Sequence, residues 1–161
     1  MYKFFKLLCV GFLCITASYG QQSAIYTNDV SKYASALSLY NNEQFLASQV
    51  LFQNVKDEVK DVTIQGDCAY YIADVAMRLG QKGADNLMLK FVEEYPSSTK
   101  RNSAFLNVAE YYFDNGEYSQ SQKWYERVDS GSLSSAALER YNFNNGYGYF
   151  KNKEFDKAKS I

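Results

Sequence analysis

The tetrapeptides Asn115-Gly116-Glu117-Tyr118 and Asn152-Lys153-Glu154-Phe155 lie in the middle of two similar segments, each with a helix-like apolar pattern on both sides. A third copy is Asn42-Glu43-Gln44-Phe45, and Leu79-Gly80-Gln81 is a degenerate fourth. The steps between the copies are 36, 37 and 37 residues when the equivalent positions are taken as Phe45, Gln81, Tyr118 and Phe155. Self-similarity at an interval of roughly 20–50 residues indicates a repeat architecture.

Apolar residues on both sides of Asn115-Gly116 recur at intervals of three and four, the spacing of an amphipathic helix. Phe105, Val108 and Tyr112 form one such stripe, and a second stripe begins at Tyr118. Gly116 can adopt the left-handed conformation that commonly ends a helix. The unit is therefore predicted to be helix, tight turn, helix, and no alternating β pattern is long enough to compete.

The same periodicity predicts eight helices along the chain. Their approximate ranges are 29–41, 43–57, 63–79, 83–95, 98–114, 117–129, 134–151 and 154–161. Side chains that can accept hydrogen bonds from the free N–H groups of a first helical turn precede five of the periodic runs. These predicted N-caps are Asp29, Asn42, Thr63, Ser98 and Ser134.

The first twenty residues have the composition of a secretory signal peptide. Lys3 and Lys6 precede an apolar run over 7–17, and small residues stand before Gln21. We therefore assign 1–20 to a signal peptide and 21–28 to a short N-terminal segment. A membrane anchor is the alternative, but the run is about half the ~20 apolar residues that a spanning helix needs. A lipoprotein signal is disfavoured because Leu13 precedes Cys14.

Composition excludes several classes of protein. The chain has 17 basic and 18 acidic residues, of which only Lys3 and Lys6 lie in the leader, so the mature part has a net charge of −3. This lacks the basic footprint of a nucleic-acid binder. Cys68 is the one cysteine of the mature part, so no internal disulfide can form there, and a buried structural role is expected for it.

With these residues in place, the segment from Phe105 to Val128 resembles a tetratricopeptide repeat. The matching positions in this third copy are Phe105, Val108, Ala109, Tyr112, Gly116, Tyr118, Ser121, Tyr125 and Val128. The other copies match through Ala36, Leu39, Phe45, Ser48, Phe52 and Val55, through Cys68, Val75, Ala84, Met88, Phe91 and Pro96, and through Gly146, Tyr149, Phe155 and Ala158. The resemblance implies an all-α fold, a right-handed α-solenoid of antiparallel helix pairs.

The repeat array is expected to span 29–161, with units at about 29–62, 65–98, 102–135 and 139–161, the last incomplete. Its period of 36–37 residues is longer than the usual ~34 of the family. That length resembles repeat proteins of the Gram-negative cell envelope. Because the fourth unit stops at Ile161, we expect the chain to be the N-terminal part of a longer protein.

Residues suited to catalysis are scarce. The sequence contains no His, which removes Ser-His-Asp triads and His-based metal sites. Glu93 and Glu94 are expected on the solvated surface. Glu110 and Asp114 share one helix face and are better placed to contact a partner than to catalyse a reaction. We expect no cofactor and no metal ion.

In tetratricopeptide repeats the first helices of the units line a concave face. Carried over by resemblance, the predicted partner-binding residues are Tyr33, Leu37, Tyr40, Met77, Leu106, Glu110, Phe113, Phe143, Tyr147 and Phe150. Ala69, Ala73 and Lys151 are expected beside them, which gives a groove with aromatic ends and an Ala-lined middle that could take an apolar peptide. The alternative is that half of these aromatic side chains pack against neighbouring helices or against the missing repeats.

The leading functional hypothesis is a non-enzymatic scaffold, exported to the periplasm or associated with the outer membrane, that binds a protein or peptide through the concave face. We expect no nucleic-acid partner for this scaffold and no membrane-spanning segment after signal cleavage. Two alternatives remain open. One is the helical arm of a longer envelope enzyme that acts on peptidoglycan, and the other is a lipoprotein of the outer-membrane-assembly kind.

Overall fold

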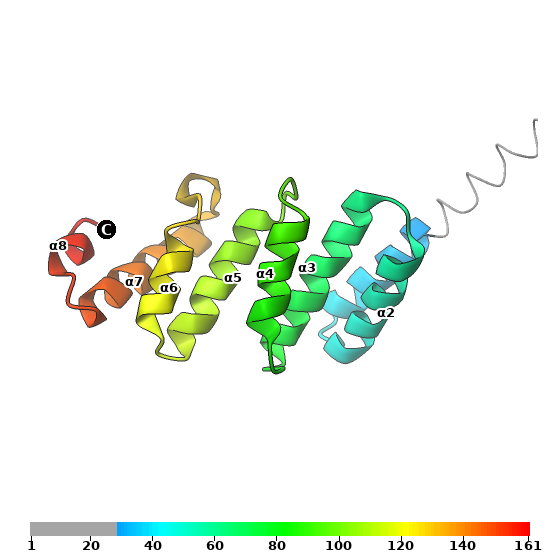
Figure 1. The fold of residues 1–161 in the computed structure, drawn as a ribbon, viewed down its shortest axis with the longest axis horizontal. Helices are drawn as coiled ribbons and strands as arrows, with labels where there is room; N and C mark the ends of the chain where they lie inside the picture. The colour runs from blue at the N-terminus through cyan, green and yellow to red at the C-terminus, as the bar shows by residue number, and fades with distance from the viewer. Residues whose placement is uncertain (1–28) are drawn as a thin grey trace, which may run out of the picture.

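All regular structure in residues 29–161, which the computed structural model describes, is helical (Figure 1). The predicted all-α class is thus confirmed for this part of the chain, where no strand occurs. The predicted signal peptide 1–20 and the segment 21–28 lie outside the described residues.

Each of the eight predicted helices is present. Residues 29–41 are helical, and the elements that follow are α2 (Phe45–Glu58), α3 (Val62–Arg78), α4 (Ala84–Glu94), α5 (Arg101–Asp114), α6 (Tyr118–Tyr125), the 3-10 turn η1 (Ser130–Ser132), α7 (Ser135–Lys151) and α8 (Phe155–Lys159).

Several helices are shorter than predicted, and α5, α6 and α8 are shorter by three residues or more. Helix α5 begins at Arg101 rather than at 98, because the preceding residues form turns in which Ser98 N–H donates to the Tyr95 carbonyl. Helix α6 ends at Tyr125 rather than at 129. There the hydrogen bonds change from four-residue to three-residue spacing, with Val128 N–H donating to the Tyr125 carbonyl. The chain then becomes extended at Asp129.

The predicted N-caps are only partly correct. Ser134 caps α7, its hydroxyl accepting from the N–H of Ala137. Helix α3 is capped by Asp61, which accepts from the N–H of Thr63 and Ile64, so the predicted cap Thr63 lies inside the helix. Asn42 and Ser98 do not hold a helix start, and the predicted cap Asp29 adjoins the residues outside the described range, so it stays a prediction.

One turn geometry ends the first helix of every repeat. Its central residue has a positive φ: Glu43 (59°), Gly80 (62°), Gly116 (77°) and Lys153 (64°). In the third copy Gly116 N–H donates to the Phe113 carbonyl at 2.9 Å, and Glu117 N–H donates to the Tyr112 carbonyl at 2.8 Å. The same pair of bonds recurs in the other three copies, which is the Schellman motif of helix C-termini.

These turns fix the register of the repeats. The positive-φ residues lie 37, 36 and 37 residues apart, so the residues equivalent to Phe45 are Lys82, Tyr118 and Phe155. Gln81, which the sequence motif places in this set, lies one position too early. Its true equivalents are Gln44, Glu117 and Glu154, whose N–H groups complete the same turn.

The aromatic residues after three of these turns occupy matching environments. The ring of Phe45 packs on Tyr40 at 5.8 Å between centroids. Tyr118 packs on Phe113 at 5.4 Å, and Phe155 packs on Phe150 at 5.7 Å. In each case the partner lies five residues earlier, so the expected equivalence of these three positions is confirmed.

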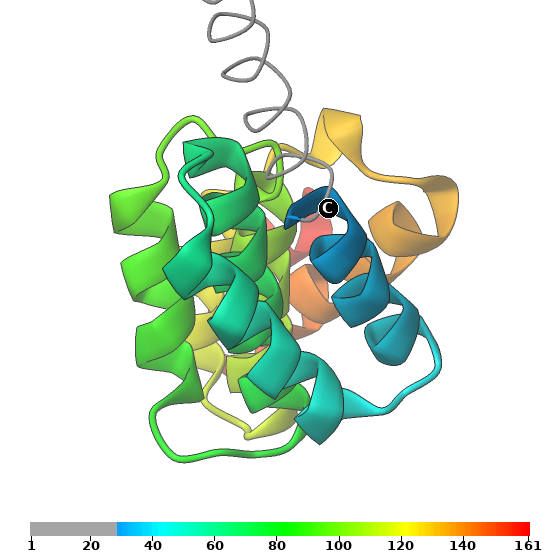
Figure 2. The same ribbon diagram turned by 90° about the vertical axis from the view of Figure 1, so that its right-hand side faces the viewer.

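Consecutive helices run in opposite directions and lie side by side (Figure 1). First helices also contact one another, α3 with α5 and α5 with α7, and Figure 2 shows the array from the end at residues 29–41. The core runs between the helices as three buried clusters. In the cluster nearest the N-terminus, which contains Phe52, the Phe52 ring stacks on Tyr71 at 4.9 Å.

Cys68 belongs to the same cluster as Phe52 and is fully buried and unpaired, as expected for a structural cysteine. Burial raises the pKa of its thiol to about 12, so the thiol remains protonated at neutral pH.

Single substitutions at two equivalent turns should change the free energy of unfolding in opposite directions. Gly116→Ala places a Cβ in open space, so its cost of about 1 kcal/mol comes only from the left-handed backbone. Lys153→Gly at the same φ should gain about 0.5–1 kcal/mol. Urea unfolding monitored by circular dichroism measures both. Shifts of the same sign would contradict the equivalence of the two turns.

Candidate functional site

The four turns define three sets of equivalent positions on the first helices. Counted back from each turn, they are Tyr33, Tyr70, Leu106 and Phe143, then Leu37, Asp74, Glu110 and Tyr147, then Tyr40, Met77, Phe113 and Phe150. We call this set the first-helix face. All ten predicted partner-binding residues belong to it, and the structure adds Tyr70 and Asp74.

The middle of the first-helix face differs from the sequence expectation. Tyr70 and Asp74 take the positions expected for Ala69 and Ala73, because the register of the second repeat is shifted by one residue. Ala73 points into the core and is fully buried. The expected Ala-lined middle is therefore wrong, and this part of the face is polar.

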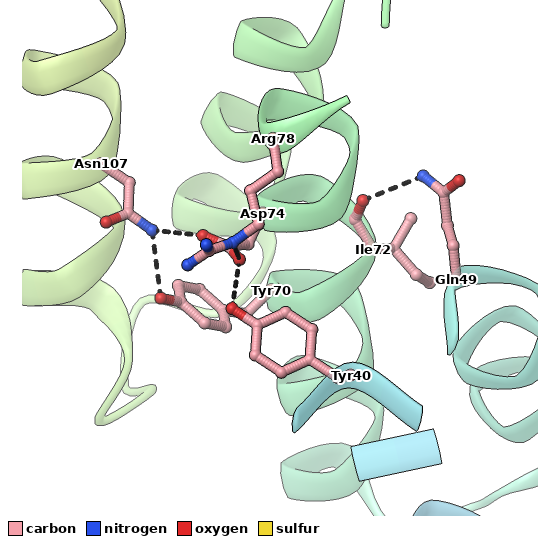
Figure 3. A network of polar contacts seen from close by, with 7 residues as sticks. All are labelled: Tyr40, Gln49, Tyr70, Ile72, Asp74, Arg78 and Asn107. Carbon is pink, nitrogen blue, oxygen red and sulfur yellow. Dashed lines mark hydrogen bonds and ion pairs between the residues drawn. The ribbon is translucent and has the colours of Figure 1, made fainter. Parts of the chain in front are cut away.

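A hydrogen-bond network is centred on Asp74, whose side chain is only 5% exposed (Figure 3). The hydroxyl of Tyr40 donates to one carboxylate oxygen at 2.5 Å, and Arg78 Nε donates to the same oxygen at 2.6 Å. Asn107 Nδ2 donates to the other oxygen at 2.6 Å and also to the Tyr70 hydroxyl at 3.2 Å.

This network joins three first helices, since Tyr40 belongs to 29–41, Asp74 to α3 and Asn107 to α5. Two further polar contacts extend the pattern along the array. Tyr33 donates its hydroxyl to Asp67 at 3.0 Å, and Arg140 Nε donates to Glu110 at 2.6 Å. Predicted site residues thus hold neighbouring repeats together.

The tyrosines of the network stay neutral to high pH. Burial, reinforced by the bonded Asp74 carboxylate, raises the pKa of Tyr40 well above its ordinary value. Burial and the nearby Asp74 charge do the same for the pKa of Tyr70. Both phenols therefore remain hydrogen-bond partners rather than candidate bases at physiological pH.

The N-terminal half of the first-helix face is mainly internal. Tyr33, Leu37 and Tyr40 are partly buried and pack against the cluster that contains Phe52. Met77 is partly buried and packs against a second cluster, the one that contains Phe91. Leu106 is 7% exposed and belongs to the third cluster, the one that contains Tyr125, so its side chain contributes to the core.

The C-terminal half carries a contiguous group of rings, four of them exposed and two, Phe113 and Tyr118, partly buried. We call this group the aromatic cluster: Phe113, Tyr118, Phe143, Tyr147, Phe150 and Phe155. Tyr147 lies at its centre, 5.8 Å from Phe113 and from Tyr118 and 6.1 Å from Phe143. Lys151 lies 5.7 Å from the rings of Tyr118 and Tyr147, within reach of a cation–π contact.

Exposure separates this cluster from the rest of the face. Phe143 is 68% exposed, Phe150 56% and Phe155 50%. Large exposed apolar groups that are contiguous, rather than scattered, mark interaction surfaces. The four aromatic site residues predicted here, Phe113, Phe143, Tyr147 and Phe150, are thus brought together by the fold.

An open hollow of about 280 Å³ lies between α3 and α5, beside the Asp74 network. The charged and amide side chains that line it are Asp74 and Arg78 of α3 and Asn107, Glu110 and Asp114 of α5. Of these carboxylates, Asp74 and Glu110 are paired with arginines, whereas Asp114 is exposed and forms no ion pair within residues 29–161.

Among residues 29–161, no group of three acidic or cysteine side chains is arranged to hold a metal ion. In the same range, no helix combines the length and apolar character that crossing a bilayer requires. Comparison of the chain with protein-family models, with curated proteins and with solved structures found no match in any of the three.

Removing the Asp74 carboxylate should destabilise the protein by about 2–3 kcal/mol, because Asp74→Ala leaves Tyr40 and Asn107 without their acceptor. Asp114→Ala, which removes an exposed carboxylate, is the matched control and should stay within about 0.5 kcal/mol.

The double variant Asp74→Ala/Asn107→Ala then measures the contact between α3 and α5. Urea unfolding of the four proteins in the cycle should give a coupling free energy of about 1 kcal/mol. Strict additivity of the two single effects would show that the bond seen in Figure 3 does not stabilise the array.

Stability should also fall at alkaline pH. Burial and the hydrogen-bonded Asp85 raise the pKa of Tyr112 to about 12, whereas an unfolded tyrosine ionises near pH 10. The folded state therefore binds its proton more tightly, and this contribution is complete below about pH 10 and is lost as the pH rises toward about 12. Unfolding free energies between about pH 8 and about pH 11 should decline less steeply for Tyr112→Phe than for wild type. Equal slopes would contradict the assignment.

Proposed function

We propose that this chain is a tetratricopeptide-like array, a right-handed α-solenoid, that acts as a non-enzymatic scaffold of the bacterial cell envelope. The predicted signal peptide is the basis for export to the periplasm or the outer membrane. The repeated helix–turn–helix geometry supports the assignment to a repeat family. The absence of His from the sequence argues against the common hydrolytic and metal-dependent chemistries.

The observation that carries the binding role is the exposure of the aromatic cluster. Three phenylalanines at least half exposed, Phe143, Phe150 and Phe155, keep substantial apolar area in water. Removing such area from water is favourable by about 25 cal/mol per Å². A protein partner that covers these rings therefore gains free energy without any chemical step.

The internal repetition supports a specific form of partner. Phe113 on α5 is covered by Tyr147 of α7, and Glu110 is paired by Arg140 of the same helix. The equivalent residues on α7 are Phe150 and Tyr147. We therefore infer that the partner presents a helix that covers Phe150 and Tyr147 as α7 covers α5.

Paired charge substitutions test this proposal. Phe143→Asp/Phe150→Asp disrupts the aromatic cluster, and Leu46→Asp/Val50→Asp is a matched control on α2, where Leu46 is 65% and Val50 63% exposed. Because all four side chains are already exposed, neither pair should unfold the protein, which circular dichroism verifies. Affinity capture from envelope extract should recover a defined partner with wild type and with the α2 control, and should lose it with the α7 pair.

Equal recovery by the two double variants would count against the aromatic cluster as the binding surface. Loss of the partner with the α2 pair alone would place the binding surface on α2, in the first repeat.

A further inference from the structure

A second hollow is lined by residues at the end of α4, at the start of α5 and just after α6. Figure 1 shows that these helix ends lie opposite the tight turns. Its volume is about 630 Å³. The apolar side chains that line it are Leu89, Val92 and Phe105, and the charged ones are Glu93, Arg101 and Arg127. It shares no residue with the first-helix face.

Two arginines are held in this hollow by aromatic rings. The guanidinium carbon of Arg101 lies 5.3 Å from the centre of the Phe105 ring, and that of Arg127 lies 5.9 Å from the same ring. Arg127 also lies 4.7 Å from the Trp124 ring, which itself packs on Phe105 at 6.1 Å. Guanidinium groups stack well on such faces, and stacking restricts their motion before any ligand arrives.

Neither guanidinium is neutralised by a carboxylate within residues 29–161. The ion pairs there use Arg78 and Arg140 but neither Arg101 nor Arg127. Arg101 donates one long hydrogen bond, 3.5 Å, to the carbonyl of Pro96. Glu93 lines the hollow without coming within ion-pair distance of either arginine. Since each arginine has five N–H donors, most of these donors remain available to a ligand.

We propose that this hollow, which we name the arginine hollow, binds a peptide segment that carries a carboxylate next to an apolar side chain. The fork of N–H donors on a guanidinium matches a carboxylate with two parallel hydrogen bonds. Leu89, Val92 and Phe105 supply the apolar surface beside it. The negative charge of Glu93 repels a doubly charged phosphate group more than a singly charged carboxylate. The arginine hollow is thus a second docking site, independent of the aromatic cluster.

Trp124, the single tryptophan of the chain, provides a direct readout because Arg127 stacks on its ring. The probe is N-acetyl-leucyl-glutamate amide, and N-acetyl-leucyl-glutamine amide is its uncharged match. The glutamate probe should change the fluorescence of Trp124 in a saturable way, with a dissociation constant in the millimolar range, and added salt should weaken it. The glutamine probe should bind about tenfold more weakly.

Substitutions in the hollow sharpen the test. Arg101→Gln and Arg127→Gln should each weaken binding of the glutamate probe about tenfold, and Glu93→Gln should strengthen it about twofold. Arg140→Gln, which removes an arginine already paired with Glu110, is the control and should bind as wild type does. Because Arg127→Gln alters the surroundings of Trp124, binding of the glutamate probe to this variant is also followed by NMR, through the amide signals of Asn102 and Ser103.

Equal binding of the two peptide probes would overturn the proposal, as would unchanged affinity in Arg101→Gln and Arg127→Gln variants that remain folded by circular dichroism. Tighter binding of inorganic phosphate than of the glutamate probe would also overturn it in favour of a phosphate site. A response only to vesicles of anionic phospholipid would assign the arginines to a membrane surface instead.

Discussion

The structure depends on one backbone constraint, the left-handed residue that ends every first helix. Four such residues, 37, 36 and 37 positions apart, reverse the chain with the same pair of hydrogen bonds. Because the turn geometry is constant, the side chains that precede it point the same way in each repeat. Repetition of a backbone turn therefore creates the columns of residues from which both the core contacts and the first-helix face are built.

Tyrosine has a particular part in holding the repeats together. Its ring packs in the apolar layer while its hydroxyl reaches a carboxylate on a neighbouring helix, as Tyr33 does with Asp67 and Tyr40 with Asp74. Both properties come from one side chain with an apolar body and a polar tip. In residues 29–161, where the single cysteine is unpaired, such contacts supply specific links between repeats without a disulfide.

Glutamine amides also join the second helix of one repeat to the first helix of the next, as Gln49 does when its Nε2 donates to the carbonyl of Ile72 at 3.2 Å. At the contact of α6 with α7, Gln122 is buried and its Nε2 donates to the carbonyl of Asn145 at 3.0 Å. A Cβ at Gly148 would lie 2.1 Å from the same nitrogen, so a side chain at this position would displace the Gln122 amide from its hydrogen bond. Both contacts also contain an aromatic pair: Tyr125 packs on Tyr141 at 5.4 Å between α6 and α7, and Phe52 stacks on Tyr71 between α2 and α3.

The sequence was sufficient for the helices and for most turns, because Gly116 and the periodic apolar stripes are strong local signals. It was insufficient for the second repeat. There Gly80 and Gly83 both have positive φ and α4 starts only at Ala84, which obscures the motif. A shift of one residue rotates a helix position by about 100°. That rotation explains why Asp74 was missed and Ala73 was placed on the surface.

The same limit applies to the functional surfaces. Exposure of Phe143 and Phe150 depends on which helices cover them, and no local pattern encodes that. The arginine hollow was also not anticipated. Arg101 and Arg127 are 26 positions apart in the sequence and meet only because α5 and α6 are antiparallel. Two arginines near Phe105 and Trp124 in adjacent predicted helices were the only sequence signal for it.

The most direct test of the account is a measurement of side-chain proximity by nuclear Overhauser effects in solution. If the turns set a common register, the rings of Phe45 and Tyr40, of Tyr118 and Phe113, and of Phe155 and Phe150 should all give cross-peaks. Cross-peaks in one repeat that are absent from the others would contradict a shared turn geometry, and with it the alignment of residues on the first-helix face.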